Sequence, residues 1–325
     1  MKKVSIIVPC REIDFMTGKC IIKCLKLDYE DFEILILPDT IDREASKKYK
    51  DKKLRIIETG PVKPAFKRNL GMEKSKGNFF AFIDSDAYPE KDWLKNAMQY
   101  FKEEKIGIVG GPNLTPTEGN FWEKISGYVL SNFWTSGDAC VRYKKSKNCF
   151  VKELPSCNYI SRKEISPKYD PSFLTAEDSE FCFKVEDQGY KILYAKDVVV
   201  FHHRRDTLKK HLKQMFIYGR DIAWLSKKKF TLDKFYYSVL SIFTLGVVGG
   251  IILSFFSSII KVIFLFLMLI YLLIIFSTSI HKNINITFWI TTTTILTHFY
   301  YGFGWIYGIL FKNKNIQANR GLNIR

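Results

Sequence analysis

Short apolar runs alternate with polar stretches over the first 112 residues of the chain. The apolar runs are rich in Ile, Val, Leu and Phe, which favours strands, and they cover 4–9, 32–37, 54–58, 78–83 and 106–109. The stretches between them are patterned like helices and cover 17–27, 42–49, 64–75 and 90–101. Strands that alternate with helices predict an α/β fold, in which a mostly parallel sheet carries helices on its faces.

A different pattern begins near residue 235. Three apolar stretches, 235–260, 262–280 and 286–311, are each long enough to cross a bilayer core, which takes about 20 residues in a helix. Aromatic residues crowd the ends of this region, and Trp and Tyr favour the membrane interface. We therefore predict a transmembrane region over 235–311 with about three hydrophobic segments, followed by a basic tail over 312–325.

The charge of that tail leaves the number of crossings open. The N-terminal apolar run is too short for a signal peptide, so we expect the first domain to stay in the cytoplasm. Three spans would then place the four positive charges of the tail outside, which the positive-inside rule disfavours. One segment, such as the first with its three glycines, could instead be re-entrant or lie in the interface.

An amphipathic segment precedes the apolar region. Within 206–230, six lysines are interspersed with apolar residues at roughly helical spacing. This pattern is typical of a helix that lies on an anionic leaflet, although a solvated basic face on an ordinary helix has the same composition. We predict an interface helix over 206–230, which leaves 1–205 as the catalytic domain.

The formal net charge of +17 narrows the choice of partners. A basic chain of 325 residues can bind nucleic acid, but its Lys and Arg residues are scattered or juxtamembrane and form no recognisable reading motif, so we expect no nucleic-acid partner. The charge suits an anionic leaflet and anionic substrates. The seven cysteines are odd in number and contain no Cys-x-x-Cys pair, so they predict neither a disulfide framework nor a zinc site.

Polar side chains follow the predicted strands, at the sheet edge where ligands bind in folds of this type. Asp84 and Asp86 end a strongly apolar strand. Extended residues i and i+2 point to the same side, so both carboxylates can converge on one hard cation. Mg²⁺ typically takes one or two protein carboxylates together with phosphate oxygens. A solvated strand end can carry the same pattern, so the interpretation depends on the rest of the chain.

Three other segments could complete such a site. Glu177 and Asp178 open a predicted helix, where a carboxylate is either a cap or a positioned general base. His202 ends a later strand and could be a third metal ligand or a phosphate contact, or an ordinary polar strand end. Lys67 and Arg68 offer positive charge toward a diphosphate, unless they form a solvated helix face.

These segments, in this order, resemble a family 2 glycosyltransferase of the GT-A fold over about residues 3–225. The resemblance lies in VSIIVP at 4–9, FEILILPD at 32–39, KRNLG at 67–71, DSD at 84–86, ED at 177–178 and VFH at 200–202. It implies a Rossmann-like mixed sheet flanked by helices. It also implies an inverting transferase that uses a nucleotide-sugar, UDP-linked by default, and Mg²⁺ or Mn²⁺.

The resemblance also implies roles for particular residues. It assigns Asp178 as the catalytic base, and Asp86 with His202 as metal ligands. The donor would be bound by Pro9, Arg11, Glu12, Asp39, Lys67, Arg68, Asp84 and Asp86. Glu177 would orient the site or bind acceptor, and Asn158 and Arg162 are acceptor-side residues by position only.

The chain departs from the family pattern in three places. Residues 10–12 read CRE where the family often has Tyr-Asn-Glu, and 40–42 read TID in place of the usual Asp-Gly-Ser turn. The Gln-x-x-Arg-Trp motif of processive synthases is absent, because MFIY follows Gln214. This absence favours a single addition over polymerisation.

We therefore predict a membrane-bound enzyme that adds one sugar to a membrane-associated acceptor in glycan or cell-envelope biosynthesis. The expected acceptor is lipid-linked, such as a polyprenyl-phosphate or polyprenyl-diphosphate sugar, or a glycolipid, and a soluble acceptor is the other possibility. A processive polysaccharide synthase and a catalytically inactive, membrane-anchored binding protein are the alternatives. The intact Asp84, Asp86, Asp178 and His202 favour the active enzyme.

Overall fold

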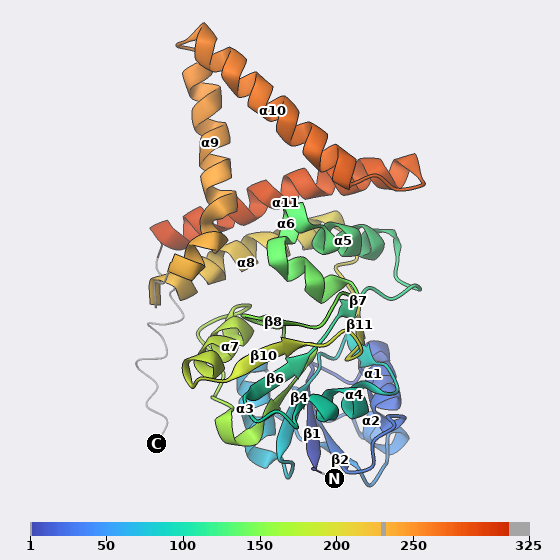
Figure 1. Cartoon of the computed structure of the whole chain (residues 1–325). Helices are drawn as coiled ribbons and strands as arrows, with labels where there is room; N and C mark the ends of the chain where they lie inside the picture. Colours follow the sequence, from blue (N-terminus) through green and yellow to red (C-terminus); the bar gives the residue numbers. More distant parts are fainter. Residues whose placement is uncertain (1, 229–231, 312–325) are drawn as a thin grey trace. The chain divides into compact units, whose positions relative to one another are not determined.

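The computed structural model describes residues 2–228 and 232–311, which form two compact units (Figure 1). The first unit comprises Met1–Pro116 and Val141–His203, and the second comprises Thr117–Cys140 and Arg204–Arg325. The segment Thr117–Cys140, which the sequence places inside the catalytic domain, therefore groups with the C-terminal helices. The predicted basic tail at 312–325 lies outside the described residues.

The first unit is built on an eight-stranded mixed sheet. The strand order is β3-β2-β1-β4-β9-β6-β10-β8. The strands are β1 (Val4–Pro9), β2 (Phe32–Leu37), β3 (Leu54–Ile56), β4 (Phe79–Phe82), β6 (Ile106–Gly110), β8 (Cys149–Val151), β9 (Tyr159–Arg162) and β10 (Lys191–Tyr194). Strands β1 to β4 run parallel, whereas β9 is antiparallel to both β4 and β6. The predicted strands and the mixed α/β class are confirmed.

Helices cover both faces of this sheet, which is why its central strands are continuously apolar. On one face, α1 (Phe15–Leu25) and α4 (Trp93–Tyr100) contribute Ile21 and Trp93 to the core. On the other face, α3 (Pro64–Lys74) and α7 (Glu177–Asp187) pack in a second cluster. A short α2 (Arg43–Lys48) and a 3-10 turn, η2 (Lys163–Ile165), complete the unit.

Two local features set the positions of α1 and α3. Helix α1 begins after Asp14, whose carboxylate accepts from the Thr17 amide at 2.8 Å. Helix α3 lies close against β1 because Gly71 has no side chain. A Cβ there would meet Ile7 Cγ2 at 2.6 Å. This close approach fixes where α3 delivers the preceding Lys67 and Arg68.

A small second sheet includes β5, the strand that follows β4 in the chain. It has the order β5-β11-β7, with β5 (Ala87–Pro89), β7 (Asn113–Leu114) and β11 (Val200–His202). Strand β11 is antiparallel to β5, with His202 opposite Ala87. The pairing therefore carries His202 next to the segment that begins at Asp84.

The second unit is helical. Its helices are α5 (Phe121–Ser131), α6 (Phe133–Ser136), α8 (Leu208–Lys228), η3 (Leu232–Ser238), α9 (Val239–Ser254), α10 (Ser258–Thr278) and α11 (Ile284–Leu310). The 3-10 helix η1 (Gly137–Tyr143) connects this unit to the first along the chain. Helix α8 falls within the predicted interface segment. Among the described residues, two helices are long and apolar enough to cross a membrane, Phe235–Ser254 and Ser258–Thr278. The third predicted segment forms α11.

Candidate active site

The parallel strands β1, β2 and β4 bring the predicted donor-binding segments to one edge of the sheet. Pro9 pairs with Leu37 at the ends of β1 and β2, and the Asp39 amide donates to the Arg11 carbonyl at 2.9 Å. Pro9 is buried, whereas the side chains of Arg11 and Glu12 are exposed. The exposed polar groups at this edge are thus available to a bound molecule.

Asp84, Asp86 and His202 lie close together at this edge. One ligand atom of each lies within 4.8 Å of the others, and His202 Nε2 is 3.1 Å from Asp86 Oδ1. Two carboxylates and an imidazole are a donor set that suits Mn²⁺, and the carboxylates suit Mg²⁺. The three residues therefore fit a divalent cation.

The protonation of His202 is linked to its neighbours. Burial alone lowers the pKa of an imidazole, but Cys157 and the Asp86 carboxylate together raise the pKa of His202 to about 10. A histidine binds metal only in its neutral form. A divalent cation at this position would therefore displace the proton that joins His202 to Asp86.

Arg68 connects this group to the second pair of carboxylates. Its guanidinium is buried and donates to Asp84 at 2.8 Å and to Glu177 at 3.0 Å. Burial alone would lower the pKa of Arg68, but these two carboxylates raise it above its ordinary value. The hydrogen bonds of Arg68 hold Asp84 and Glu177, and its contact with a diphosphate stays a prediction.

Lys67 is also turned inward. Its side chain is buried, and its ammonium donates to the carbonyls of Cys10 and Leu37 and to the Asp39 carboxylate. These contacts tie the ends of β1 and β2 together. Lys67 therefore orients Asp39, which keeps 26% of its side chain exposed at the predicted donor site.

Asp178 lies in the first turn of α7 and is partly exposed. Its carboxylate accepts from the amides of Ser156 at 3.3 Å and Ser179 at 2.9 Å. Burial, and then the negative charge of Glu153, raise the pKa of Asp178 to about 6. Burial and the charge of Asp178 likewise raise the pKa of Glu177 to about 7. A carboxylate with a raised pKa is a better proton acceptor near neutral pH.

An ion pair that the sequence did not single out lies near Asp178. Arg142 donates to Glu153 at 2.6 Å, and Glu153 is buried. Glu153 raises the pKa of Asp178, whereas Arg142 lowers it. The two residues belong to no recognisable motif, so only the fold reveals that they act on Asp178.

The two residues predicted at the acceptor side by position have internal roles. The Asn158 side chain is fully buried and bonds to Trp93 Nε1 and to the carbonyls of Pro112 and Val198. Arg162 pairs with Phe79 at the start of β4, the opposite end from Asp84, and donates to nearby backbone carbonyls. The structure does not bring Arg162 to the site, because β9 runs antiparallel to β4.

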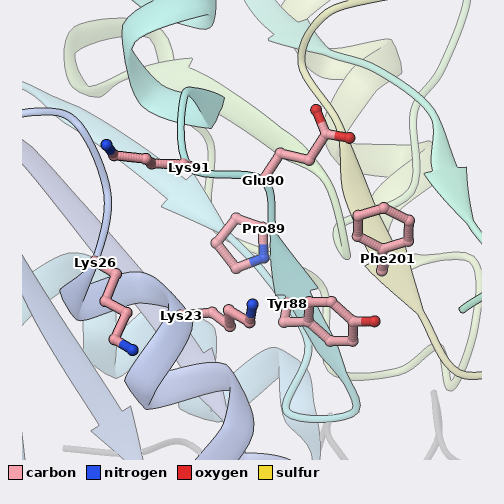
Figure 2. A pocket seen from close by; sticks show the side chains of 7 residues that line it. All are labelled: Lys23, Lys26, Tyr88, Pro89, Glu90, Lys91 and Phe201. Atoms are coloured by element: carbon pink, nitrogen blue, oxygen red, sulfur yellow. The ribbon is translucent and has the colours of Figure 1, made fainter. Parts of the chain in front are cut away.

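A separate pocket of about 580 Å³ lies beside β5 and β11 (Figure 2). It is lined by Lys23, Lys26, Tyr88, Pro89, Glu90, Lys91 and Phe201. None of these residues belongs to the group of carboxylates described above. The pocket is therefore distinct from the candidate active site.

The sheet topology, the Asp-x-Asp pair with its neighbouring histidine and the carboxylates of α7 together define a glycosyltransferase of the GT-A type. The model of the glycosyl transferase family 2 matches residues 5–166. Residues 5–166 belong to this family, and the chain is a glycosyltransferase.

Two curated relatives share much of its length. A dolichyl N-acetyl-α-D-glucosaminyl phosphate 3-β-D-2,3-diacetamido-2,3-dideoxy-β-D-glucuronosyltransferase of Methanococcus voltae is 27% identical over 76% of this chain and 79% of its own. The glycosyltransferase AglE of Haloferax volcanii is 25% identical over 65% of this chain and 71% of its own.

A solved structure has a similar fold. The mannosyltransferase PcManGT of Pyrobaculum calidifontis, in complex with GDP-Man and Mn²⁺, matches with a TM-score of 0.65 and 14% identity. The match covers 95% of this chain and 87% of that one. The similarity confirms the predicted fold, with its mixed sheet and C-terminal helices.

Proposed function

We propose that the chain is a membrane-bound, metal-dependent, inverting glycosyltransferase. It transfers a single sugar from a nucleotide-sugar to a lipid-linked acceptor. A UDP-linked sugar is the default expectation for the donor. The observation that carries this proposal is the continuous set of charged groups from Asp86 and His202, through Asp84 and Arg68, to Glu177 and Asp178. These residues would form a cation site and provide a general base in one place.

Asp84, Asp86 and His202 would hold the cation. A bound Mg²⁺ or Mn²⁺ would offset the negative charge that develops on the departing diphosphate. The exposed residues Arg11, Glu12 and Asp39 at the ends of β1 and β2 would contact the nucleotide. Arg68 keeps Asp84 in place, because its guanidinium is held at the other end by Glu177.

Asp178 would act as the general base. As the acceptor hydroxyl oxygen bonds to the anomeric carbon, Asp178 takes the hydroxyl proton and the bond from that carbon to the diphosphate oxygen breaks. Attack on the face opposite the leaving group inverts the anomeric configuration. The raised pKa of Asp178 supports this role, since proton transfer is efficient when the pKa of the base lies near the working pH.

The proposed acceptor is lipid-linked, and the proposed location is the cell membrane with the catalytic unit in the cytoplasm. The name of the Methanococcus voltae relative describes a dolichyl phosphate sugar as its acceptor. The two apolar helices Phe235–Ser254 and Ser258–Thr278 would keep this chain at the membrane that contains such a lipid.

A thermal-shift screen tests the donor and metal parts of the proposal. The full-length chain in detergent is heated with a panel of UDP-, GDP- and other nucleotide-sugars, with and without Mn²⁺. A ligand that binds the folded state raises the unfolding temperature by mass action. We expect one donor to raise it only when Mn²⁺ is present. An equal shift without Mn²⁺ in a metal-free buffer would contradict the metal requirement.

A further inference from the structure

Within the helical unit, α11 lies along α8 rather than crossing it. The contacts keep one register along α8 and the C-terminal half of α11: His211 bonds to Thr297 at 2.9 Å, and Trp224 Nε1 donates to the Phe311 carbonyl at 2.9 Å. Between these points the backbones approach closely, because a Cβ on Gly304 would meet the Phe216 carbonyl oxygen at 2.1 Å. The two helices therefore run side by side for several turns.

The charges of α8 keep it out of the hydrocarbon core. Exposed lysines occur near both of its ends, at Lys209, Lys210, Lys213, Lys227 and Lys228. Its middle carries the ion pair of Arg220 with the fully buried Asp221, at 2.7 Å. Ionisable groups at the bilayer centre are costly, so a helix with charges along its whole length does not span. The C-terminal half of α11, which packs beside α8 in register, is held at the same depth.

The side chains of α11 have the distribution of a helix that touches lipid. Its buried face is small or polar and includes Thr287, Thr293, Thr294, Thr297, Gly304 and Gly308. Its exposed face carries the large apolar and aromatic residues Phe288, Tyr300, Phe303, Tyr307 and Leu310. Small residues pack between helices in membranes, whereas a helix facing water would show the reverse distribution.

Helix α6 is tied to both membrane-boundary ends of the α9–α10 pair. The Asn132 side chain, which caps α6, donates to the carbonyl of Thr278, the last residue of α10. The Tyr236 hydroxyl, at the start of the first candidate span, donates to the Ser136 carbonyl at 3.3 Å. The α6 residues Phe133 and Trp134 are 55% and 49% exposed. Aromatic side chains at this level are typical of the membrane interface.

We propose that α5, α6, α8 and α11 form a layer in the plane of the membrane interface and that only the α9–α10 hairpin crosses the bilayer. We call these four helices the interface layer. Its apolar surface, formed by the exposed face of α11 with Phe133 and Trp134, contacts the boundary between lipid head groups and acyl chains. Two crossings leave the end of α11 on the side of the membrane from which α9 starts, and the basic sequence of 312–325 favours the cytoplasmic side by the positive-inside rule.

Protease protection of epitope tags tests the crossing number. The full-length chain carries one tag before Met1, one in the 255–257 turn between α9 and α10, and one after Arg325, and it is expressed in bacteria. In inside-out membrane vesicles, we expect protease to remove both terminal tags and to spare the turn tag until detergent is added. Protection of the C-terminal tag alongside loss of the N-terminal tag would show that α11 crosses. Loss of all three tags would show that the hairpin does not cross.

A second chain with only the two terminal tags keeps this test valid if the turn insertion disturbs the hairpin. Both terminal tags should again be removed, and opposite outcomes for the two would overturn the interface layer. This experiment depends only on topology, so its failure leaves the proposed sugar transfer untouched, and failure of the donor screen leaves the topology untouched.

Tryptophan quenching by brominated lipids tests the contact of the layer with lipid. The full-length chain is placed in bilayers brominated close to the head groups. We expect Trp134→Phe to lower the quenched part of the emission. Trp93→Phe is the matched control, because Trp93 is fully buried in the first unit and should contribute only unquenched emission. Equal quenching in the wild type and Trp134→Phe would contradict insertion of α6.

Discussion

Arg68 donates to Asp84 at 2.8 Å from a buried position, and this ion pair joins the two halves of the candidate site. The other side of the same guanidinium is bonded to Glu177 at 3.0 Å, next to the proposed base. Asp84, which we propose lies at the cation and donor side, is therefore held by the same guanidinium that holds Glu177, which we propose lies at the acceptor side. Substitutions in one half of the site should be felt in the other.

Replacing Arg68 should affect both folding and activity. Arg68→Ala leaves Asp84 and the buried Glu177 without their shared partner, and loss of one member of a buried pair costs about 3 kcal/mol or more. We expect a lower unfolding temperature together with weaker donor binding. Arg68→Lys keeps the charge but cannot reach both carboxylates. Its unfolding temperature and donor binding should therefore lie between those of the wild type and those of Arg68→Ala. Wild-type stability in Arg68→Ala would contradict the bridging role.

Replacing Asp178 should slow the chemical step while leaving the donor bound. Asp178→Asn removes the proton acceptor, and general-base catalysis typically contributes about 10²–10⁴-fold. We expect kcat to fall within that range and the donor-dependent thermal shift to persist. Glu186→Gln, near the far end of α7, is the matched control and should retain full turnover. Near-normal kcat in Asp178→Asn would remove Asp178 from the mechanism.

The cation site can be tested without turnover. Asp86→Ala and His202→Ala each remove one of three grouped ligands, so each should weaken Mn²⁺ binding at least tenfold. Electron paramagnetic resonance of free Mn²⁺ in a titration of the full-length chain measures this directly. Glu164→Gln serves as the control, because Glu164 lies on η2. This variant should bind Mn²⁺ as the wild type does. Unchanged binding in both site variants would place the metal elsewhere.

Activity should fall on the acidic side of neutrality. The pKa of Asp178 is raised to about 6 and that of its neighbour Glu177 to about 7, so the pair gains protons between pH 7 and 6. Protonation removes the base, and kcat/KM should decline about tenfold per pH unit below this range. The profile is measured at saturating Mn²⁺ to separate it from metal loss. A flat profile from pH 7.5 to 5 would contradict the assignment.

The same two carboxylates should make the folded state less stable as the pH rises. Their pKa values are raised above the unfolded values near 4, so the folded state holds their protons more tightly. Their contribution to stability is full below about pH 4 and is lost as the pH passes through about 6 to 7. Asp178→Asn should reduce this part of the pH dependence, as thermal unfolding at a series of pH values would show.

The apolar runs predicted most of the sheet, because strands buried on both faces are continuously hydrophobic. The position of Asp84 and Asp86 could also be predicted from the sequence. They follow a strand, and the carboxyl ends of parallel strands lie at the same edge of a sheet. The direction of Lys67 and Arg68 could not be predicted. Cations on a helix can face a ligand or the interior, and only the close packing of α3 against β1 at Gly71 turns them inward.

Residues placed by position alone were the least predictable. Asn158 and Arg162 precede the Glu-Asp pair, but both side chains are buried, and the antiparallel direction of β9 carries Arg162 to the far end of the sheet. The grouping of residues 117–140 with the C-terminal helices was also hidden, because it depends on long-range contacts such as Ser126 with His211 at 2.8 Å.

Transfer of labelled sugar to a lipid acceptor tests the central proposal most directly. The full-length chain is incubated with the donor found in the thermal screen, a polyprenyl phosphate-linked sugar and Mn²⁺, and label in the lipid phase is measured. We predict transfer of one sugar that requires Mn²⁺, inverts the anomeric configuration and drops at least 100-fold in Asp178→Asn. Transfer that persists after metal removal, or at the wild-type rate in Asp178→Asn, would contradict it.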